Sequence, residues 1–391
     1  MIVVSCSGRF HAFALAEQLE KHQMLQAFYT SYAYQKNKAM RRFAKRVDKE
    51  AIPVGKLHTA IEVAVMMRMG RSAHSCNAYF DKWVARKIKS NQENYRAFIG
   101  WSGMSLHALR QAKQDGKLVV LERGSSHILY QNEVLKEEYK RFGIDFSIDP
   151  RTIEKELQEY EEADYIAIPS IFVKNSFLEY GIDPAKLVQN PYGSSSHFKK
   201  TAPVEAAPVF RILYMGSLLI RKGLVYLFEA LDILRKKGVK FEAWFIGKVD
   251  EELKATVEQY NRPEYQFFGH INFYDLPRYI NACDVAVQPS LEEGLSMVVP
   301  QLIACGVPVV ASTNSGGEDV IEEGETGYVV PIKNPQAIAE KLQHLYENPD
   351  LLAQMKRQAA NSPKTEFSWD SYGQRYAGFL KTALAGNFTK A

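Results

Sequence analysis

The sequence predicts an α/β protein built from two doubly wound domains, each a parallel sheet with helices on both faces. Its 391 residues are enough for two to three domains of ordinary size. Short apolar strands alternate with helical segments in two separate runs, which is the pattern of parallel sheets covered on both faces. Between the runs, residues 191–208 are rich in Pro, Ser, Gly and Ala and lose this periodicity, as expected of an interdomain linker.

The first run, residues 1–190, predicts the N-terminal domain. Helical segments such as His11–Lys21 and Ser105–Lys113 separate its short apolar strands. The predicted strands are Met1–Ser5, Leu25–Thr30, Tyr95–Gly100, Leu118–Glu122, Tyr165–Ile168 and Leu187–Gln189.

The second run, residues 209–366, predicts the C-terminal domain. Apolar residues three and four apart over Leu224–Lys237 predict an amphipathic helix that Gly238 ends. A last helix, Trp369–Leu384 within residues 367–391, is expected to cross back to the first domain. The predicted strands are Val209–Met215, Phe241–Ile246, Gln266–Phe268, Val285–Gln288, Val307–Ala311 and Tyr328–Val330.

Composition excludes several classes of protein. Apolar residues are 46% and charged residues 24%, which excludes a disordered or collagen-like chain. The sequence contains no run of eighteen apolar residues, and its start has no basic segment typical of a signal peptide. Its four cysteines form no CxxC or Cys/His cluster, which predicts a reduced compartment and no structural zinc. We therefore expect a cytoplasmic globular protein.

Charge is unevenly divided along the chain. Residues 1–110 hold 18 basic and 7 acidic residues, a balance of +11, whereas the remainder holds 31 and 38, a balance of −7. Much of the excess lies in Lys36–Lys49, where apolar residues interleave at helical spacing. A basic amphipathic helix here would bind peripherally to an anionic membrane, at its inner face, or would simply be a solvated surface helix. No zinc-finger or RNP-type motif supports a nucleic-acid partner.

The most informative stretch is Pro289–Ser312, PSLEEGLSMVVPQLIACGVPVVAS. A strand ends near Pro289, an acidic turn containing glycine follows, and Pro300 suits the first position of a helix. Such a strand–loop–helix directs free backbone N–H groups at a bound anion, often a phosphate. Glu293 and Gln301 flank the loop, and each can bind hydroxyl groups.

This stretch resembles the signature of retaining glycosyltransferases of family 4, also called glycosyl transferases group 1, which have the GT-B fold of two facing Rossmann-like domains. Glu293 matches the first signature glutamate, which in the family contacts the donor sugar. Gln301 stands where a second glutamate usually holds the ribose. The residues after the glutamate, Gly294, Leu295 and Ser296, match the donor-binding loop.

The segment Tyr214–Leu231, YMGSLLIRKGLVYLFEAL, resembles the family's first strand of the nucleotide domain, its phosphate-binding loop and the next helix. Lys222 matches the family lysine that neutralises the donor diphosphate, and Arg221 would supply a second charge. Gly216 and Ser217 would form the donor-binding loop, with Ser217 in place of an arginine that is common in the family. Later segments, NSGGEDVIEEGETGYVVP and FSWDSYG, resemble further family motifs in the same order.

The resemblance is weaker in the first domain, which in the family binds the acceptor. Gly8 follows the first strand, where the family has a glycine-containing loop, and His11 lies just beyond it. An active-site histidine often follows a later strand, and either Arg123 or His127 stands near that place. We favour His127, because Ser125 and Ser126 would cap a helix that aims the imidazole at the cleft.

The resemblance implies a metal-independent hexosyltransferase without a cofactor, whose donor substrate is a nucleotide-sugar. The acceptor would be a glycan or lipid-linked molecule of cell-envelope or exported polysaccharide biosynthesis. Two alternatives stay open: a catalytically inactive nucleotide-sugar-binding protein, which Gln301 and Ser217 would favour, and a nucleotide-sugar epimerase of the same fold.

Overall fold

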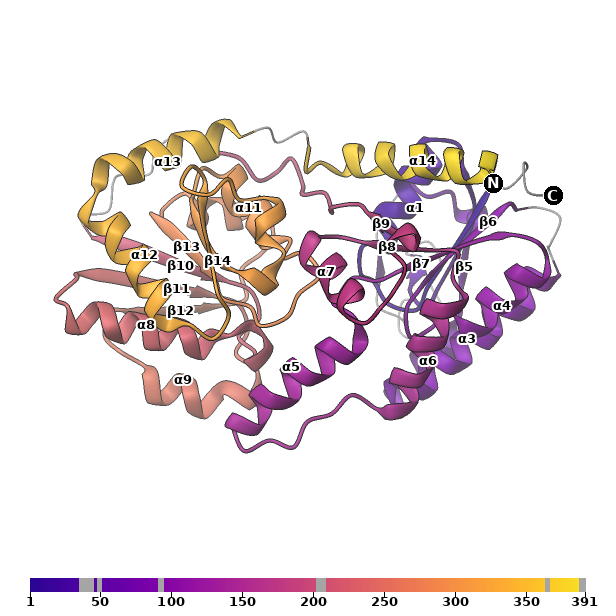
Figure 1. The fold of residues 1–391 in the computed structure, drawn as a ribbon, viewed down its shortest axis with the longest axis horizontal. Helices are drawn as coiled ribbons and strands as arrows, with labels where there is room; N and C mark the ends of the chain where they lie inside the picture. The colour runs from indigo at the N-terminus through magenta and orange to yellow at the C-terminus, as the bar shows by residue number, and fades with distance from the viewer. Residues whose placement is uncertain (35–45, 48–50, 91–94, 202–208, 363–365, 387–391) are drawn as a thin grey trace.

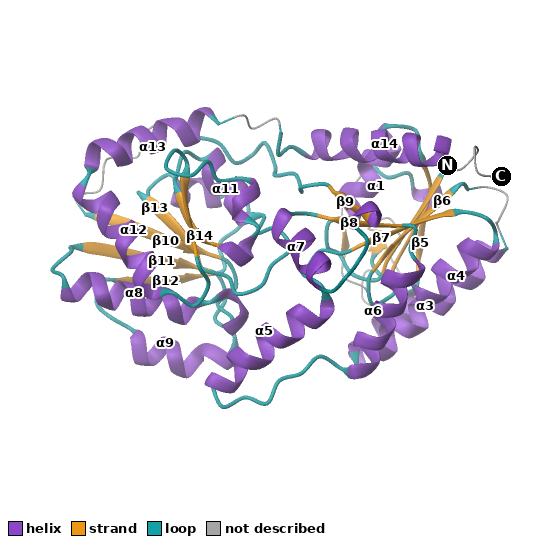
Figure 2. Cartoon of the chain, viewed as in Figure 1, coloured by secondary structure: helices purple, strands orange, loops and turns teal. Residues whose placement is uncertain are grey.

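A computed structural model shows two α/β domains that lie side by side (Figures 1 and 2). The structure describes residues 1–34, 46–47, 51–90, 95–201, 209–362 and 366–386. Each strand and helix of the two predicted domains and the last helix is present where bounds were given, with ends displaced by two residues or fewer. Among the two-residue shifts, the strand expected from Val307 begins at Val309 because Pro308 has no N–H to donate to a ladder.

The described part of the first domain contains a seven-stranded sheet in which all pairs are parallel, in the order β5-β2-β1-β6-β7-β8-β9. The strand order reverses between β1 and β6, which is where ligands bind in doubly wound folds. The strands are β1 (Ile2–Cys6), β2 (Leu25–Thr30), β5 (Leu57–Thr59), β6 (Ala97–Trp101), β7 (Leu118–Glu122), β8 (Tyr165–Ile168) and β9 (Leu187–Gln189). The helices are α1 (Ala12–Lys21), α2 (Ile61–Arg68), α3 (Ala73–Lys89), α4 (Leu106–Gln114), α5 (Ile128–Arg141), α6 (Pro150–Glu162) and α7 (Ile171–Glu179).

The second domain contains a parallel sheet of six described strands in the order β12-β11-β10-β13-β14-β15, and its order reverses between β10 and β13. The strands are β10 (Phe210–Met215), β11 (Phe241–Ile246), β12 (Tyr265–Gly269), β13 (Val285–Gln288), β14 (Val309–Ser312) and β15 (Gly327–Val330). The helices are α8 (Leu224–Lys236), α9 (Lys254–Tyr260), α10 (Leu276–Ile280), α11 (Val298–Ala304), α12 (Pro335–Glu347) and α13 (Pro349–Asn361).

The last helix, α14 (Trp369–Gly386), follows the second domain in sequence but lies along the first domain (Figure 1). Its buried face, which includes Tyr372 and Leu380, packs in one apolar cluster with Leu15 and Leu19 of α1. Beside this cluster, the Asp370 carboxylate accepts hydrogen bonds from side chains of α1. The helix therefore ties the end of the chain to the first domain.

The basic segment at residues 36–49 lies almost wholly outside the described residues. Arg46–Val47 forms a short strand, β4, that pairs with β3 (Ala33–Tyr34). At these two residues the expected helix is therefore wrong, because their backbone groups bond to another strand.

Candidate active site

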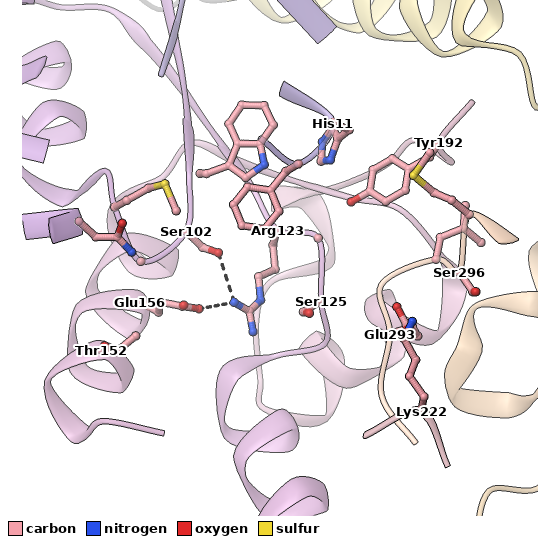
Figure 3. Close-up of a pocket in the computed structure, with 18 of the residues that line it drawn as sticks. His11, Ser102, Arg123, Ser125, Thr152, Glu156, Tyr192, Lys222, Glu293 and Ser296 are labelled. Atoms are coloured by element: carbon pink, nitrogen blue, oxygen red, sulfur yellow. Dashed lines mark hydrogen bonds and ion pairs between the residues drawn. The ribbon is translucent and has the colours of Figure 1, made fainter. Parts of the chain in front are cut away.

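The two strand-order reversals face each other across a cavity of about 520 Å³. One wall comes from loops that follow β1, β6 and β7 of the first domain, and it includes His11 and Arg123 (Figure 3). The opposite wall comes from loops that follow β10 and β13 of the second domain, and it includes Lys222 and Glu293. Parallel strands place the loops at their carboxyl ends along one edge of the sheet, so the fold itself brings these segments together.

Lys222 and Arg221 converge on Glu293 in the second-domain wall. The Lys222 ammonium pairs with Glu293 Oε1, and Arg221 Nη1 lies 3.3 Å from the same oxygen. Burial, with the neighbouring Arg221 charge acting in the same direction, lowers the pKa of Lys222 to about 7. Two cations are thus held beside one partly buried carboxylate, where a bound anion would compete for them.

Glu292, the neighbour of Glu293, has a different environment that the sequence did not indicate. Its side chain is fully buried between the domains. One carboxylate oxygen accepts hydrogen bonds from the Ser126 backbone N–H and hydroxyl, both at 2.9 Å, and the other accepts from Gln131 Nε2 at 3.0 Å. The acidic turn is therefore no solvated loop, and its first carboxylate joins the two domains.

Gly294 lies where the backbones of the two domains come close together. A Cβ atom at this position would overlap the carbonyl oxygen of Gly124 in the first domain. The Gly294 carbonyl also accepts a 2.5 Å hydrogen bond from the Ser170 hydroxyl. A side chain here would push the two walls of the cavity apart, so the glycine permits the observed closure.

The remaining donor-binding predictions divide into two groups. Leu295 and Ser296 line the cavity, and the Ser296 hydroxyl is buried without a protein partner. Gly216 and Ser217 follow β10 at the same edge of the sheet but do not line the cavity, and the half-buried Gln301 lies on α11.

Pro300 is the third residue of α11, which begins at Val298, so its predicted place as first helical residue is wrong. The first turn still tolerates it, because N–H groups there have no intrahelical acceptor.

His127 does not face the cavity, so the prediction of its orientation is wrong. The residue is 1% exposed, and its ring stacks on Tyr180 and contacts Tyr160 and Phe177. His127 is itself the N-cap of α5, a role predicted for the serines before it, since its Nδ1 accepts a 3.4 Å hydrogen bond from the Leu129 N–H. Burial lowers its pKa to about 4. The imidazole is held by packing against aromatic rings.

Arg123 borders the cavity, but its charge is fully engaged by the protein (Figure 3). Nε and Nη2 both donate to the Ser126 carbonyl, and Nη2 also donates to Gln131. Nη1 donates to Ser102 and, at 2.6 Å, to Glu156. All five N–H groups therefore have acceptors, and Arg123 orders the loop after β7.

His11 is the histidine that borders the cavity. Its Nε2 lies 2.9 Å from the buried Glu122 carboxylate, at the end of β7. Gly8 lies in the same loop after β1. Trp101, Glu122 and Tyr192 were missed by the sequence analysis, although the first two end β6 and β7, where residues of doubly wound sheets commonly meet ligands.

Comparison with known proteins confirms the resemblance seen in the sequence. Residues 197–362 match the family model described as glycosyl transferases group 1. The putative glycosyltransferase EpsD of Bacillus subtilis is 26% identical over 40% of this chain and 44% of its own length. The amylovoran biosynthesis glycosyltransferase AmsK of Erwinia amylovora is 25% identical over 72% of this chain and 69% of its own. The chain spans less than half the length of the first relatives it matches.

Solved structures confirm the GT-B fold. Sucrose-phosphate synthase of Thermosynechococcus elongatus superposes with a TM-score of 0.73 at 17% identity, over 98% of this chain and 99% of that one. Anabaena HepE in complex with UDP superposes with a TM-score of 0.69 at 16% identity, over 97% of this chain and 99% of that one.

In the part of the chain that is described, no helix is long and apolar enough to cross a membrane.

Proposed function

We propose that the protein is a retaining glycosyltransferase that moves a sugar from a nucleotide-sugar to a hydroxyl group of a glycan or lipid-linked acceptor. The observation that carries this proposal is the convergence of Lys222 and Arg221 on Glu293 in the wall of an interdomain cavity. Further support comes from the matching family model and from relatives named for colanic acid, amylovoran and capsule biosynthesis. HepE, of the same fold, was solved with UDP-glucose.

The chemistry follows from the charges in this wall. When a nucleotide-sugar enters, its diphosphate draws Lys222 and Arg221 away from Glu293 and receives their positive charge as the bond to the sugar breaks. Glu293, released from its ion pairs, accepts hydrogen bonds from the donor sugar, and Gln301 binds the ribose. The two cations supply charge without a metal ion or another cofactor, so we expect transfer to persist in the presence of a chelator.

Retention of configuration would follow from attack on the face that the diphosphate leaves. The acceptor oxygen forms the new bond to the anomeric carbon while the bond to the diphosphate oxygen breaks. The acceptor's proton passes to the departing diphosphate. This reaction needs no covalent intermediate on the protein.

A thermal-shift panel of UDP-, GDP- and ADP-sugars is the direct test of donor binding. A ligand that binds only the folded protein at 100 times its Kd stabilises it by about 2.7 kcal/mol, which a melting curve resolves. Release of nucleoside diphosphate with a new glycoside identifies a transferase, and the anomeric signals of the product report retention. Binding without turnover would indicate an inactive binding protein, and an isomerised nucleotide-sugar would indicate an epimerase.

We further propose a cytoplasmic protein that binds the inner face of the membrane peripherally through Lys36–Lys49. The support is the +11 balance of residues 1–110, because each basic residue near an anionic leaflet contributes about 1 kcal/mol. Sedimentation with anionic and neutral vesicles at low and high salt tests this. Replacement of Arg41, Arg42, Lys45 and Arg46 by Ser should abolish binding to anionic vesicles, and binding that ignores salt and lipid charge would contradict it.

A further inference from the structure

The first-domain wall of the cavity has a chemistry unlike that of the donor wall. Among its described residues, the only Lys or Arg is Arg123, and all five of its N–H groups already have protein acceptors. Glu156, the acidic residue of this wall, is paired with Arg123 at 2.6 Å. The wall therefore offers no free charge of Lys or Arg to a phosphate and suits a neutral ligand.

Two buried polar atoms of this wall lack a protein partner. They are the indole Nε1 of Trp101 and the hydroxyl of Tyr192, from residues that are 3% and 7% exposed. Buried donors of this kind are almost always hydrogen-bonded in proteins, to protein, water or ligand. The His11 ring lies beside both, with its centroid 4.3 Å from that of Tyr192 and 5.0 Å from that of Trp101, so these polar groups gather in one region of the wall. Figure 3 shows His11 and Tyr192 side by side.

An exposed aromatic ring completes this wall. Phe10 lines the cavity and is 66% exposed, so its ring is accessible to a ligand. Its backbone has a φ of 31°, which bulky residues rarely adopt and which costs free energy. The ring lies against Gly8, where an added Cβ atom would overlap it. The loop thus holds Phe10 in a strained, exposed position.

We propose that Phe10, Trp101, Tyr192 and His11 form the acceptor subsite, and that the acceptor presents a neutral sugar ring to it. A pyranose ring has an apolar face, which would stack on Phe10, and peripheral hydroxyl groups, which would bond to Trp101 Nε1 and Tyr192 Oη. This inference rests on the proposed function, since it names the chemical class of the acceptor. It excludes a phosphate or a simple lipid alcohol as the group held in this wall.

Ligand-observed NMR on the full-length protein without nucleotide tests the subsite. The probes are the methyl α-glycosides of glucose, galactose, mannose and N-acetylglucosamine, with glycerol 3-phosphate and octanol as the charged and apolar alternatives. At least one glycoside should show saturation transfer to its ring protons. Phe10→Ala should weaken that glycoside about fivefold, as expected from the loss of one aromatic contact. Tyr192→Phe, which retains the ring, should weaken it by a similar factor.

Tyr274→Ala is the matched control, because Tyr274 is 74% exposed on the second domain and does not line the cavity. It should leave the glycoside Kd unchanged. The inference is overturned if no glycoside binds, if only glycerol 3-phosphate or octanol binds, or if Phe10→Ala behaves like the control. Binding of UDP-, GDP- and ADP-sugars is measured separately. A protein that binds glycosides but none of these donors would refute the proposed function while leaving the sugar subsite in place.

Discussion

Replacing Glu293 by Gln should separate nucleotide binding from sugar transfer. The substitution retains the size of the side chain but removes the charge that pairs with Lys222 and with Arg221. If Glu293 competes with the diphosphate for these cations, the variant should bind the free nucleoside diphosphate more tightly than the native protein does. If the carboxylate also holds the donor sugar, transfer should fall in the same variant.

The magnitudes follow from the geometry of the ion pairs. Arg221 Nη1 lies 3.3 Å from Glu293 Oε1, and at an effective dielectric constant of 20 a charge pair at about 4 Å interacts by about 4 kcal/mol before solvation costs. Since those costs cancel most of this energy, we expect a gain in diphosphate affinity of about tenfold. Loss of a hydrogen bond that strengthens in the transition state should lower kcat by about 100-fold or more.

Three measurements on one preparation decide the outcome: the Kd of the nucleoside diphosphate by calorimetry, turnover by release of that diphosphate, and Tm. Glu325→Gln is the control, because Glu325 is exposed on the same domain and should change none of them. Turnover near that of the native protein would remove Glu293 from the donor site. Weaker binding of the diphosphate would show that Glu293 does not compete for the cations.

Three further predictions concern this wall and the neighbouring contact between the domains. Lys222→Met should weaken nucleoside diphosphate at least tenfold while leaving the free nucleoside unchanged in calorimetry, and Arg221→Ala should do so partly. Burial lowers the pKa of Lys222 to about 7, and the charge of a bound diphosphate would raise it again. Diphosphate binding near pH 8 should therefore take up protons, measured from the heat in buffers of different ionisation enthalpy. Glu292→Gln should lower stability by about 1–3 kcal/mol, measured by denaturant unfolding. In either orientation its NH2 group would face a donor, Ser126 N–H or Gln131 Nε2.

Each of these predictions has a contrary result. Equal losses of affinity for nucleoside and nucleoside diphosphate would show that the two cations do not bind phosphate. Proton uptake that persists unchanged in Lys222→Met would assign it to another group, such as the nucleotide itself. A Glu292→Gln protein as stable as Glu325→Gln would remove the interdomain role of that carboxylate.

The sequence predicted the fold well because its signals are local. The spacing of apolar residues and the length of each segment distinguish the strands from the helices. The composition of the linker at residues 191–208 separates the two runs of strands and helices. The same local patterns located Lys222 and Glu293 through a family resemblance, and the structure brings these two together although they lie 71 positions apart.

His127 shows where local reasoning failed. The segment Ser125–His127 has residues suited to an N-cap, and the helix does begin there, at Ile128. The direction of the imidazole, however, depends on Tyr160 and Tyr180, which other parts of the chain bring against it. No pattern within the segment contains that information. His11 lines the cavity instead, where its partner Glu122 is 111 residues away.

The acidic turn joins closure of the two domains to the donor site through adjacent residues. Glu292 bonds to the first domain at Ser126, while Glu293 pairs with Lys222 in the second. Arg221 links them, because its Nη1 donates to the Glu292 carbonyl oxygen at 2.6 Å and lies beside Glu293 Oε1. If a diphosphate draws Arg221 toward itself, as proposed, the hydrogen bond from Arg221 to the Glu292 carbonyl would lengthen or turn. Donor binding would therefore be transmitted to the contact between the domains through one guanidinium group. Arg221→Lys retains the charge but not the planar fork. It should therefore preserve diphosphate binding better than it preserves the effect of the diphosphate on the contact between the domains.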